Sequence, residues 1–365
     1  MSEIKKIAIM TGGGDCPGLN AVIRAAVKTA IMKYGLEVVG IKHGYKGLYN
    51  GEADFVPLTL ESVSGQISEG GTILYSSNKD NLFDYTYVEN GETKRGDVSH
   101  VGVENLQKAG IDALVVVGGD GTLTSGRDFA RKGVRVIGVP KTIDNDLGAT
   151  DITFGYDTAV GVVAECIDRL RTTARSHSRI IVVETMGRYA GFIALAAGIA
   201  GGADAILIPE IKYDINKVAD HIKNIVKGDK NFAIVVAAEG AESITGERVV
   251  GRVVEDSPDP LRLTGIGNKV ADDLEKLTGM EARGAILGHI QRGGTPTAND
   301  RILSTRYGSK AIDLLMEGHS GQMVTLKGME MSYESLEKVI DQNKAIDPNG
   351  DVVKTAKAIG IAFGD

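Results

Sequence analysis

The chain has 365 residues, 42% of them hydrophobic, which is enough to fill the cores of about two domains of ordinary size. A formal net charge of −7 and two cysteines exclude a basic nucleic-acid-binding surface and a disulfide-stapled scaffold. No apolar run approaches the roughly 20 residues that cross a bilayer, and the N-terminus lacks a signal-peptide core, so we expect a cytoplasmic protein that binds neither membrane nor nucleic acid.

The chain opens with a predicted strand, a glycine-rich loop and a helix. Residues 4–10 are mostly apolar, as in a central parallel strand, and residues 21–33 have helical spacing. The loop between them, TGGGDCPGLN, precedes a helix N-terminus, where backbone N–H groups bind anions. It matches neither a dinucleotide-binding G-x-G-x-x-G nor a Walker A motif, and the alternative is a tight turn in which Asp15 caps the helix.

A mostly polar stretch follows the first helix. It predicts a strand at 37–42, loops at 43–51 and 70–83, a hairpin or surface excursion at 85–97 and a helix at 101–109. From the residues alone, Tyr45 in the first loop belongs to a surface turn and Lys79 in the second loop is a solvated cation.

Two short β-branched runs, at 113–117 and 134–139, predict buried parallel strands at the centre of the pattern. Each is followed by a loop rich in Gly and Asp, and ligands bind at the carboxyl ends of parallel strands, so we expect both loops to face one crevice. In the first loop, GGDGT, glycines let the backbone approach a phosphate. Asp120 there is a hard oxygen ligand suited to Mg²⁺, although it could instead cap the helix predicted at 124–132.

The second loop, PKTIDND, adds the remaining groups that phosphoryl transfer requires. Lys141 is a cation, Thr142 carries a hydroxyl, and Asp144 and Asp146 are carboxylates. Phosphoryl transfer needs charge neutralisation, a metal ion and a base for the acceptor hydroxyl. The two loops together therefore predict a site for phosphoryl transfer.

The second half alternates between predicted strands and helices. The strands are at 179–184, 203–209, 232–238 and 281–287, and the helices are at 155–177, 189–200, 215–227, 266–277 and 299–317. Polar groups again follow strand ends, where a ligand is expected. Glu239 can accept hydrogen bonds from sugar hydroxyls or form a structural cap. From the residues alone, Arg179 is a surface arginine and His289 is a core histidine.

Five motifs, in this order, resemble those of the 6-phosphofructokinase family. They are TGGGDCPGLN (11–20), GGDGT (118–122), PKTIDND (140–146), ETMGRYAG (184–191) and GHIQRGG (288–294). NAD kinases and lipid kinases share GGDGT but need neither of the last two motifs. A sugar-binding protein with paired α/β domains, the non-enzymatic alternative, would lack an aspartate of the Mg²⁺ type in a glycine loop.

The resemblance implies an α/β chain with two Rossmann-like domains, mainly parallel sheets and the phosphofructokinase fold. It implies a discontinuous nucleotide- and Mg²⁺-binding domain of residues 1–154 plus about 292–345. A sugar-phosphate-binding domain would take residues 155–291 plus the C-terminal segment. The implied reaction is glycolytic: the γ-phosphoryl group of ATP passes to the 1-hydroxyl of fructose 6-phosphate, giving fructose 1,6-bisphosphate and ADP.

The resemblance also assigns roles to single residues. Asp144 accepts the proton of the 1-hydroxyl, Thr142 orients the acceptor, and Arg188 stabilises the charge of the transferred group. Asp120 holds Mg²⁺, with Asp146 as a possible helper. The implied donor-binding residues are Gly14, Asn78, Lys79, Gly119, Asp120, Gly121 and Thr122. The implied acceptor-binding residues are Thr142, Ile143, Asp144, Arg179, Met186, Gly187, Arg188, Glu239, Arg283, His289, Ile290, Gln291 and Arg292.

The chain also departs from the family pattern at one binding position, and the resemblance implies an oligomeric state. The family commonly has an arginine where this chain has Asn78, and Lys79 next to it is the candidate replacement. Two of the family's arginines reach the sugar phosphate of an adjacent subunit, which implies a homo-oligomer, a tetramer or at least a dimer. The chain combines sequence features of the ATP-dependent and the pyrophosphate-dependent enzymes, as in the mixed-substrate branch of the family.

Two positions bear on the choice between ATP and pyrophosphate as donor. Gly121 leaves room for the α-phosphate of a nucleotide, whereas pyrophosphate enzymes have an aspartate there. Lys141 points the other way, because ATP enzymes of the common bacterial type have glycine at that position. An open pocket is a steric requirement and an extra cation is compatible with ATP, so we expect ATP, with a pyrophosphate-dependent phosphotransferase as the alternative.

Overall fold

A computed structural model describes residues 3–227, 230–246, 248–253 and 261–365. The chain divides into two compact units. Unit 1 comprises Met1–Thr142, Leu147–Gly155 and Arg292–Asn343, and unit 2 comprises Ile143–Asp146, Tyr156–Gln291 and Lys344–Asp365. No helix in the described part of the chain is long and apolar enough to cross a membrane.

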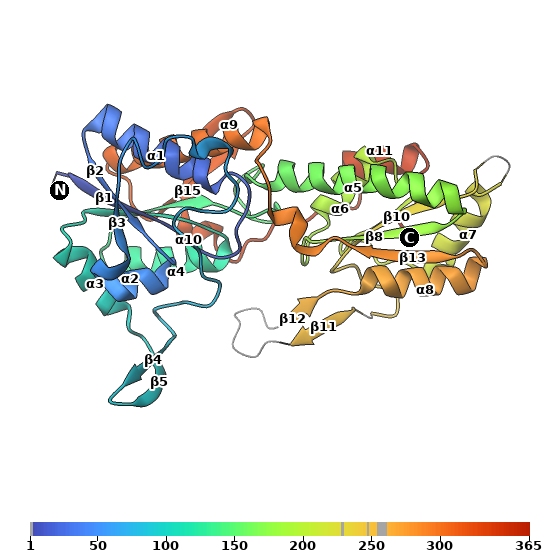
Figure 1. Ribbon diagram of the computed structural model, residues 1–365, viewed down its shortest axis with the longest axis horizontal. Coiled ribbons are helices and arrows are strands. Elements are labelled where there is room, and N and C mark those ends of the chain that lie inside the picture. The colour runs from blue at the N-terminus through green and yellow to red at the C-terminus, as the bar shows by residue number, and fades with distance from the viewer. Residues whose placement is uncertain (1–2, 228–229, 247, 254–260) are drawn as a thin grey trace. The chain divides into compact units, whose positions relative to one another are not determined.

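Unit 1 is built on a seven-stranded sheet with the order β15-β14-β7-β6-β1-β2-β3 (Figure 1). Its strands are β1 Lys6–Thr11, β2 Glu37–Ile41, β3 Phe55–Leu58, β6 Ala113–Gly118, β7 Val136–Pro140, β14 Gln322–Lys327 and β15 Glu330–Ser335. The central pairs are parallel, and the two edge strands, β3 and β15, are antiparallel to their neighbours. Every residue of β6 and β7 is buried, as a parallel strand covered on both faces requires.

Helices cover both faces of this sheet. In Figure 1, α1 and α9 lie on one face, and α2, α3, α4 and α10 lie on the other. Their bounds are α1 Leu19–Tyr34, α2 Tyr45–Asn50, α3 Ser99–Lys108, α4 Asp120–Arg131, α9 Ala298–Met316 and α10 Leu336–Val339. Leu123 and Phe129 of α4 pack with Leu114 and Val116 of β6 in the core on one face. The short 3₁₀ helices η1 Gly51–Asp54 and η2 Gln66–Ser68 complete the unit.

Two sequence predictions in unit 1 were wrong in detail. Residues 43–51 were expected to be a loop, but they contain helix α2, whose Tyr45 and Leu48 are buried in the core. Helix α4 was expected from residue 124, but it begins at Asp120, so most of GGDGT forms its first turn. Glycines conceal both helix starts, because glycine lowers helix propensity by about 1 kcal/mol relative to alanine and tertiary packing overrides it here.

Residues 85–97 form a two-stranded hairpin, β4 Tyr85–Glu89 and β5 Glu92–Gly96, which confirms the predicted hairpin. Asn90 and Gly91 form its turn with positive φ angles of 53° and 84°. Asn-Gly is the pair that such a two-residue hairpin turn favours.

Unit 2 contains a four-stranded, fully parallel sheet with the order β13-β8-β10-β9. Its strands are β8 Ile180–Thr185, β9 Ala205–Leu207, β10 Ala233–Ala238 and β13 Ala282–Ile286. Its helices are α5 Tyr156–His177, α6 Phe192–Ala200, α7 Ile215–Ile225, α8 Ile266–Thr278 and α11 Asp351–Ala358, with the 3₁₀ helix η3 Gly288–Arg292 at the unit boundary. Figure 1 shows α5 and α6 on one face of this sheet and α8 on the other.

Residues 240–259 are mostly polar and lie only partly in the described part of the chain. Within this stretch, β11 Val250–Val253 pairs antiparallel with β12 Leu261–Leu263. The residues between these two strands lie outside the described part of the chain. The sheet order and strand directions nevertheless confirm the predicted α/β class with mainly parallel sheets.

A buried carboxylate holds the start of α8. Glu184 of β8 is 2% exposed. Its carboxylate accepts hydrogen bonds from Thr264 Oγ1 at 3.0 Å, Gly265 N at 3.0 Å and Gly267 N at 2.7 Å. The residue that precedes α8 is Gly265, which has no side chain to cap the helix. Glu184 therefore supplies from the sheet the cap that the helix lacks.

Replacing Glu184 with alanine is expected to lower the free energy of unfolding by about 3 kcal/mol, because it leaves buried N–H and O–H donors without an acceptor. Urea unfolding followed by circular dichroism measures this change. Asp214→Ala is the matched control, since Asp214 caps α7 through Asn216 N at 2.9 Å on the exposed surface and should cost about 1 kcal/mol. An equal loss in the two variants would contradict the special role of Glu184.

Candidate functional site

The glycine-rich loops of unit 1 follow three adjacent parallel strands. Thr11 at the end of β1 pairs with Val117 of β6, and Gly118 of β6 pairs with Pro140 at the end of β7. The loops that follow these strands therefore begin side by side, at the carboxyl ends of the strands. Lys141 N donates to Gly118 O at 2.9 Å, which ties the second loop to the first.

Two cations flank the backbone of Gly14. The ammonium group of Lys141, whose side chain is 3% exposed, donates a hydrogen bond to the Gly14 carbonyl. Arg292 Nη1 donates to the carbonyl of Asp15 at 3.3 Å, and a Cβ at Gly14 would come within 2.9 Å of that guanidinium nitrogen. A side chain at position 14 would displace the Arg292 guanidinium, and the two cationic side chains make this loop electropositive. The structure places Arg292, which was predicted to bind the acceptor, beside the loop predicted to bind the donor.

The thiol of Cys16 lies in the same loop but does not take part in its chemistry. Cys16 is fully buried, and burial raises the pKa of its thiol to about 12. Lys141 lowers that pKa by a smaller amount. Cys16 therefore stays a neutral thiol near neutral pH and acts as a packing residue.

Asp120 is the first residue of α4 and lies about half-buried at its N-terminus, where the helix dipole favours a negative charge. Burial raises the pKa of its carboxyl, and the nearby charge of Asp341 adds to that rise. Asp341 N donates to Asp120 Oδ1 at 3.4 Å. The residue that precedes the helix is Gly119, so Asp120 is not the N-cap residue of α4.

The residues present fit Mg²⁺ in one particular binding mode. The described residues contain no group of three His, Cys, Asp or Glu side chains arranged to hold a metal ion. Mg²⁺ is usually bound by one or two carboxylates together with substrate phosphates and water, rather than by a cage of protein ligands. A half-buried carboxylate such as Asp120, in a glycine-rich loop at a helix N-terminus, suits that mode.

The first turn of α4 also contains Gly121 and Thr122. A Cβ at Gly121 would meet no atom within 4 Å, so open space adjoins this position. The carbonyl of Thr122 accepts a hydrogen bond at 2.8 Å from the hydroxyl of Tyr45, which is 3% exposed. Tyr45 thus belongs to the core and positions the helix start, which contradicts the surface-turn alternative. Asn78 and Lys79 are both exposed.

The KTIDND segment spans the unit boundary along the chain, with Lys141 and Thr142 in unit 1 and residues 143–146 in unit 2. Ile143 and Asp144 are buried. Lys344 fixes the end of the segment: its N donates to Asp146 O at 2.7 Å, and its Nζ donates to Asn145 Oδ1 at 3.0 Å. Asn145 adopts a positive φ of 54°, a conformation that asparagine tolerates better than most residues.

A strained turn follows β8 in unit 2. Gly187 has φ 137° and Arg188 has φ 50°, an uncommon value for a residue with a side chain. Arg188 N donates to Glu239 Oε1 at 3.0 Å, and a Cβ at Gly240 would come within 1.8 Å of the Arg188 carbonyl. The strands β8 and β10 end side by side, because Thr185 pairs with Ala238. Glu239 and Gly240 therefore hold the turn that presents Arg188.

Glu239 is the most strongly perturbed carboxyl of this turn. Its burial raises its pKa to about 7, against the hydrogen bond from Arg188 N. The charges of Asp144 and Glu184 raise the pKa further. Unit 2 therefore brings together Asp144, Arg188 and Glu239, three of the residues that the sequence predicted for the acceptor.

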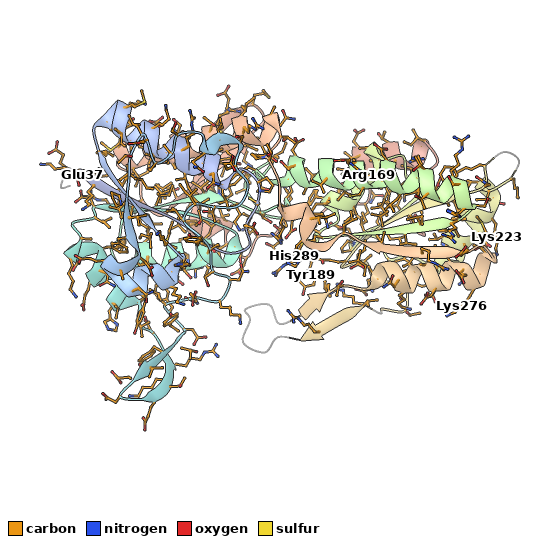
Figure 2. All side chains as sticks on the ribbon, in the orientation of Figure 1. Glu37, Arg169, Tyr189, Lys223, Lys276 and His289 are labelled. Atoms are coloured by element: carbon orange, nitrogen blue, oxygen red, sulfur yellow. The ribbon has the colours of Figure 1, made fainter. Side chains whose placement is uncertain are left out.

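The GHIQRGG segment divides into exposed and buried side chains. His289 and Ile290 are exposed on η3, and His289 is labelled in Figure 2. Gln291 is fully buried. Its Oε1 accepts from Met186 N at 3.2 Å, and its Nε2 donates to Gly288 O at 3.0 Å. These bonds fix the position of Met186 relative to η3, a role that the sequence did not predict for Gln291.

Arg179 and Arg283 lie at the amino ends of their strands, whereas the turn that contains Gly187 and Arg188 lies at the carboxyl end of β8. Arg179 precedes β8 and Arg283 is the second residue of β13, whereas Met186 follows the carboxyl end of β8. A six-residue strand spans about 20 Å. Glu281 accepts from Arg179 Nε at 2.7 Å and also binds Arg283. Within unit 2, these two arginines are thus not brought together with Arg188 and Glu239.

Residues 6–315 match the family profile described as phosphofructokinase. The chain belongs to the phosphofructokinase family. The resemblance seen in the five sequence motifs is thereby confirmed. The match covers the glycine-rich loops of unit 1, the ETMGR segment of unit 2 and the GHIQRGG segment, in which the chain passes from unit 2 to unit 1.

Three relatives place the chain within the phosphofructokinase family. It is 63% identical to "ATP-dependent 6-phosphofructokinase 2" of Clostridium perfringens over 367 residues, covering 100% of both chains. It is 44% identical to "Pyrophosphate--fructose 6-phosphate 1-phosphotransferase" of Streptomyces coelicolor over 361 residues, covering 98% of this chain and 100% of the relative. The structure of phosphofructokinase from Saccharomyces cerevisiae superimposes with a TM-score of 0.79 at 33% identity, covering 92% of this chain and 45% of that chain. The predicted phosphofructokinase fold is confirmed.

Proposed function

We propose that this chain is an ATP-dependent 6-phosphofructokinase, which transfers the γ-phosphoryl group of ATP to the 1-hydroxyl of fructose 6-phosphate in glycolysis. The observation that carries the proposal is the full-length similarity, at 63% identity, to a protein named as that enzyme. The two glycine loops of unit 1 and the Asp144–Arg188–Glu239 group of unit 2 supply the required chemistry. The products are fructose 1,6-bisphosphate and ADP.

Unit 1 binds the donor in this proposal. The backbone N–H groups of Gly14, Gly119, Gly121 and Thr122 bind the donor phosphates, and the electropositive surroundings of Gly14 favour them. Asn78 and Lys79 are exposed and directly follow Ser77, whose carbonyl accepts a hydrogen bond from Gly13 N at 3.0 Å. Lys79 takes the place of the family's arginine. Asp120 would hold Mg²⁺, and the ion would neutralise charge on the phosphates.

The acceptor is bound by residues of unit 2 together with Thr142, which directly precedes Ile143 in the chain. Asp144 takes the proton from the 1-hydroxyl as that oxygen forms its bond to the γ-phosphorus, and the bond from the γ-phosphorus to the bridging oxygen of ADP breaks. Thr142 orients the hydroxyl, and the Arg188 guanidinium stabilises the negative charge of the group in transfer. The sugar phosphate is bound by Ile143, Met186, Gly187, Glu239, His289 and Ile290, and the buried Gln291 positions Met186 for it. Arg292 belongs to unit 1, where it adds positive charge beside Gly14.

We further propose that the chain works as a homodimer or homotetramer in the cytoplasm. Arg179 and Arg283 lie about one strand length from the acceptor residues of their own unit, which suits arginines that serve a neighbouring copy. Cys16 and Cys166 are both free thiols, as in a reducing compartment. Sedimentation of the purified chain gives its oligomeric state, and a monomer with full activity would refute the shared site.

The donor is tested by a direct comparison of rates. The purified chain is given saturating fructose 6-phosphate with Mg²⁺ and either ATP or pyrophosphate, and fructose 1,6-bisphosphate is measured. We expect kcat/KM to be higher for ATP, since Gly121 is open and identity to the ATP-dependent relative is higher than to the pyrophosphate-dependent one. A higher value for pyrophosphate would establish the alternative donor, and no product with either donor would refute the proposal.

The raised pKa of Glu239 predicts a pH-dependent affinity for the sugar. Below about pH 7 its carboxyl is protonated, and as the pH rises through that value it becomes a carboxylate that accepts hydrogen bonds from hydroxyls more strongly. We expect the KM for fructose 6-phosphate to fall about threefold to tenfold as the pH rises through 7. Glu239→Gln is expected to flatten this profile, and an identical profile in that variant would show that another group titrates.

A further inference from the structure

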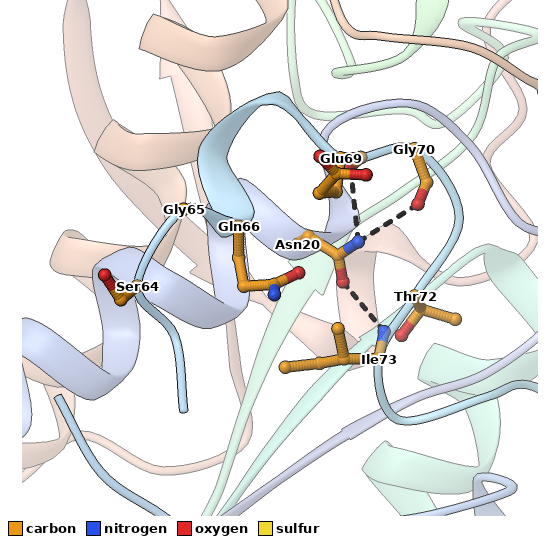
Figure 3. Close-up of a pocket in the computed structure, with 8 residues that line it drawn as sticks. All are labelled: Asn20, Ser64, Gly65, Gln66, Glu69, Gly70, Thr72 and Ile73. Carbon is orange, nitrogen blue, oxygen red and sulfur yellow. Dashed lines mark hydrogen bonds between the residues drawn. The ribbon is translucent and has the colours of Figure 1, made fainter. Parts of the chain in front are cut away.

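The buried side chain of Asn20 joins helix α1 to the segment formed by residues 69–77. Asn20 is the second residue of α1 and is 2% exposed. Its Nδ2 donates to Glu69 O at 3.2 Å and to Gly70 O at 3.1 Å, and its Oδ1 accepts from Ile73 N at 2.8 Å, as Figure 3 shows. Both amide hydrogens are therefore used, and all three bonds go to the backbone of one segment.

The middle of segment 69–77 is bonded to the strand that precedes the glycine-rich loop. Thr11, the last residue of β1, donates from Oγ1 to Tyr75 O at 2.8 Å and lies 3.1 Å from Thr72 Oγ1. Leu74 O accepts from His43 N at 2.8 Å, and the Leu74 side chain is 1% exposed. These contacts fix the direction in which the segment leaves Asn20.

The end of the segment is bonded to Gly13 on both sides of its backbone. Gly13 N donates to Ser77 O at 3.0 Å, and Ser76 Oγ donates to the carbonyl of Gly13. Gly13 has φ 78° and no side chain, so packing of its own atoms does little to fix its peptide groups. The two bonds from segment 69–77 therefore hold both peptide groups of Gly13, and through the chain they position the Gly14 N–H, while Lys141 holds the Gly14 carbonyl.

The beginning of the segment lies against the chain that follows Arg292. A Cβ at Gly70 would come within 2.4 Å of the Gly294 carbonyl, so the two backbones are in direct contact. Arg292 in turn donates to Asp15 O at 3.3 Å. Asn20, which binds the Gly70 carbonyl, thus also fixes the segment where it touches Gly294, two residues after the Arg292 that binds Asp15.

We infer that Asn20 is a positioning residue for the phosphoryl donor, acting through segment 69–77 on Gly13 and Gly14. This inference rests on the proposed function, in which the Gly14 backbone binds the donor phosphates. Asparagine inside the first turn of a helix usually competes with the helix for backbone bonds. Here its amide is directed entirely at the neighbouring segment, so its contribution lies in the position of the loop rather than in α1 itself.

The test compares Asn20→Asp with a matched control, Asn105→Asp. The change at Asn20 keeps its shape and the bond from Ile73 N but sets a carboxylate oxygen against two carbonyls. Asn105 makes the same pair of donor bonds elsewhere in unit 1, because its Nδ2 donates to Leu48 O and Tyr49 O, both at 2.9 Å. We expect Asn20→Asp to raise the KM for ATP about tenfold, with the KM for fructose 6-phosphate and kcat nearly unchanged. The control should lower the melting temperature without this selective rise.

Ser76→Ala provides a second and independent arm, since it removes the bond to Gly13 without touching Asn20. It should also raise the KM for ATP, and the double variant should show less than the product of the two effects, because both act on the same loop. If Asn20→Asp does not fold, Ser76→Ala alone decides, together with faster amide hydrogen exchange in residues 69–77.

Three results would overturn the inference: an unchanged KM for ATP in both variants, equal changes for both substrates, or fully multiplicative effects. A wild-type chain that transfers no phosphoryl group would instead refute the proposed function. The two failures are therefore distinguishable in one set of assays.

Discussion

Replacing Asp144 with asparagine is expected to lower kcat by about 10²–10⁴-fold, while the KM values for ATP and fructose 6-phosphate change little. The amide has nearly the same shape as the carboxylate but cannot accept the proton of the 1-hydroxyl. Asp144 is 5% exposed, so no bulk solvent reaches it to replace the lost base efficiently. Initial rates of fructose 1,6-bisphosphate formation measure the effect.

A second readout links Asp144 to its surroundings. The charge of Asp144 contributes to the raised pKa of Glu239, so Asp144→Asn should move the pH profile of the KM for fructose 6-phosphate toward lower pH. Asp151→Asn is the control, because Asp151 accepts from Gly328 N at 2.6 Å and takes no part in the proposed chemistry. A kcat within about tenfold of wild type in Asp144→Asn would place the base elsewhere.

Introducing an aspartate at Gly121 is expected to lower kcat/KM for ATP by about 10²-fold and to shift the donor preference toward pyrophosphate. A carboxylate about 4 Å from a phosphate oxygen opposes binding by several kcal/mol at the effective dielectric of a protein surface. A Cβ at position 121 meets no atom within 4 Å, so the new side chain enters open space and the melting temperature should hold. The measurement is kcat/KM with each donor, together with a thermal melt.

Gly161→Asp is the matched control for that experiment. Gly161 lies in α5 of unit 2, and a Cβ there also meets no atom within 4 Å. The control should therefore leave the donor preference as it is in the wild type. An unchanged kcat/KM for ATP in Gly121→Asp would mean that the donor phosphates do not approach the first turn of α4.

Much of the site was accessible from the sequence because its parts are local. A buried strand reads as a short β-branched run, and a phosphate loop after it reads as a cluster of glycines with one carboxylate. For this reason Asp120, Asp144 and Arg188 could be named before any coordinates. The resemblance to a known family then supplied roles that spacing alone does not carry.

The residues that the sequence did not reveal act over long separations. Asn20 bonds to residues 49 to 53 positions away, Glu184 caps a helix more than 80 positions later, and Lys344 holds Asn145 from 199 positions away. None of these long-range hydrogen bonds produces a repeating pattern of hydrophobic and polar residues that could be recognised in the sequence. A polar residue in a strand end or a first helical turn, as at Glu184 and Asn20, is the one local hint, because such residues are disfavoured there without a partner.

The sequence by itself determined the α/β class, the strand-loop-helix order and the identity of the glycine-rich loops, since hydrophobic periodicity and glycine placement depend on near neighbours. The tertiary structure alone decided that Gln291 is buried and positions Met186, and that Arg292 lies beside Gly14. It also decided that Arg179 and Arg283 lie at the amino ends of their strands, away from Arg188. Such facts depend on which distant segments pack together and on which polar groups then find partners. That selection is made by burial and hydrogen bonding in the folded chain.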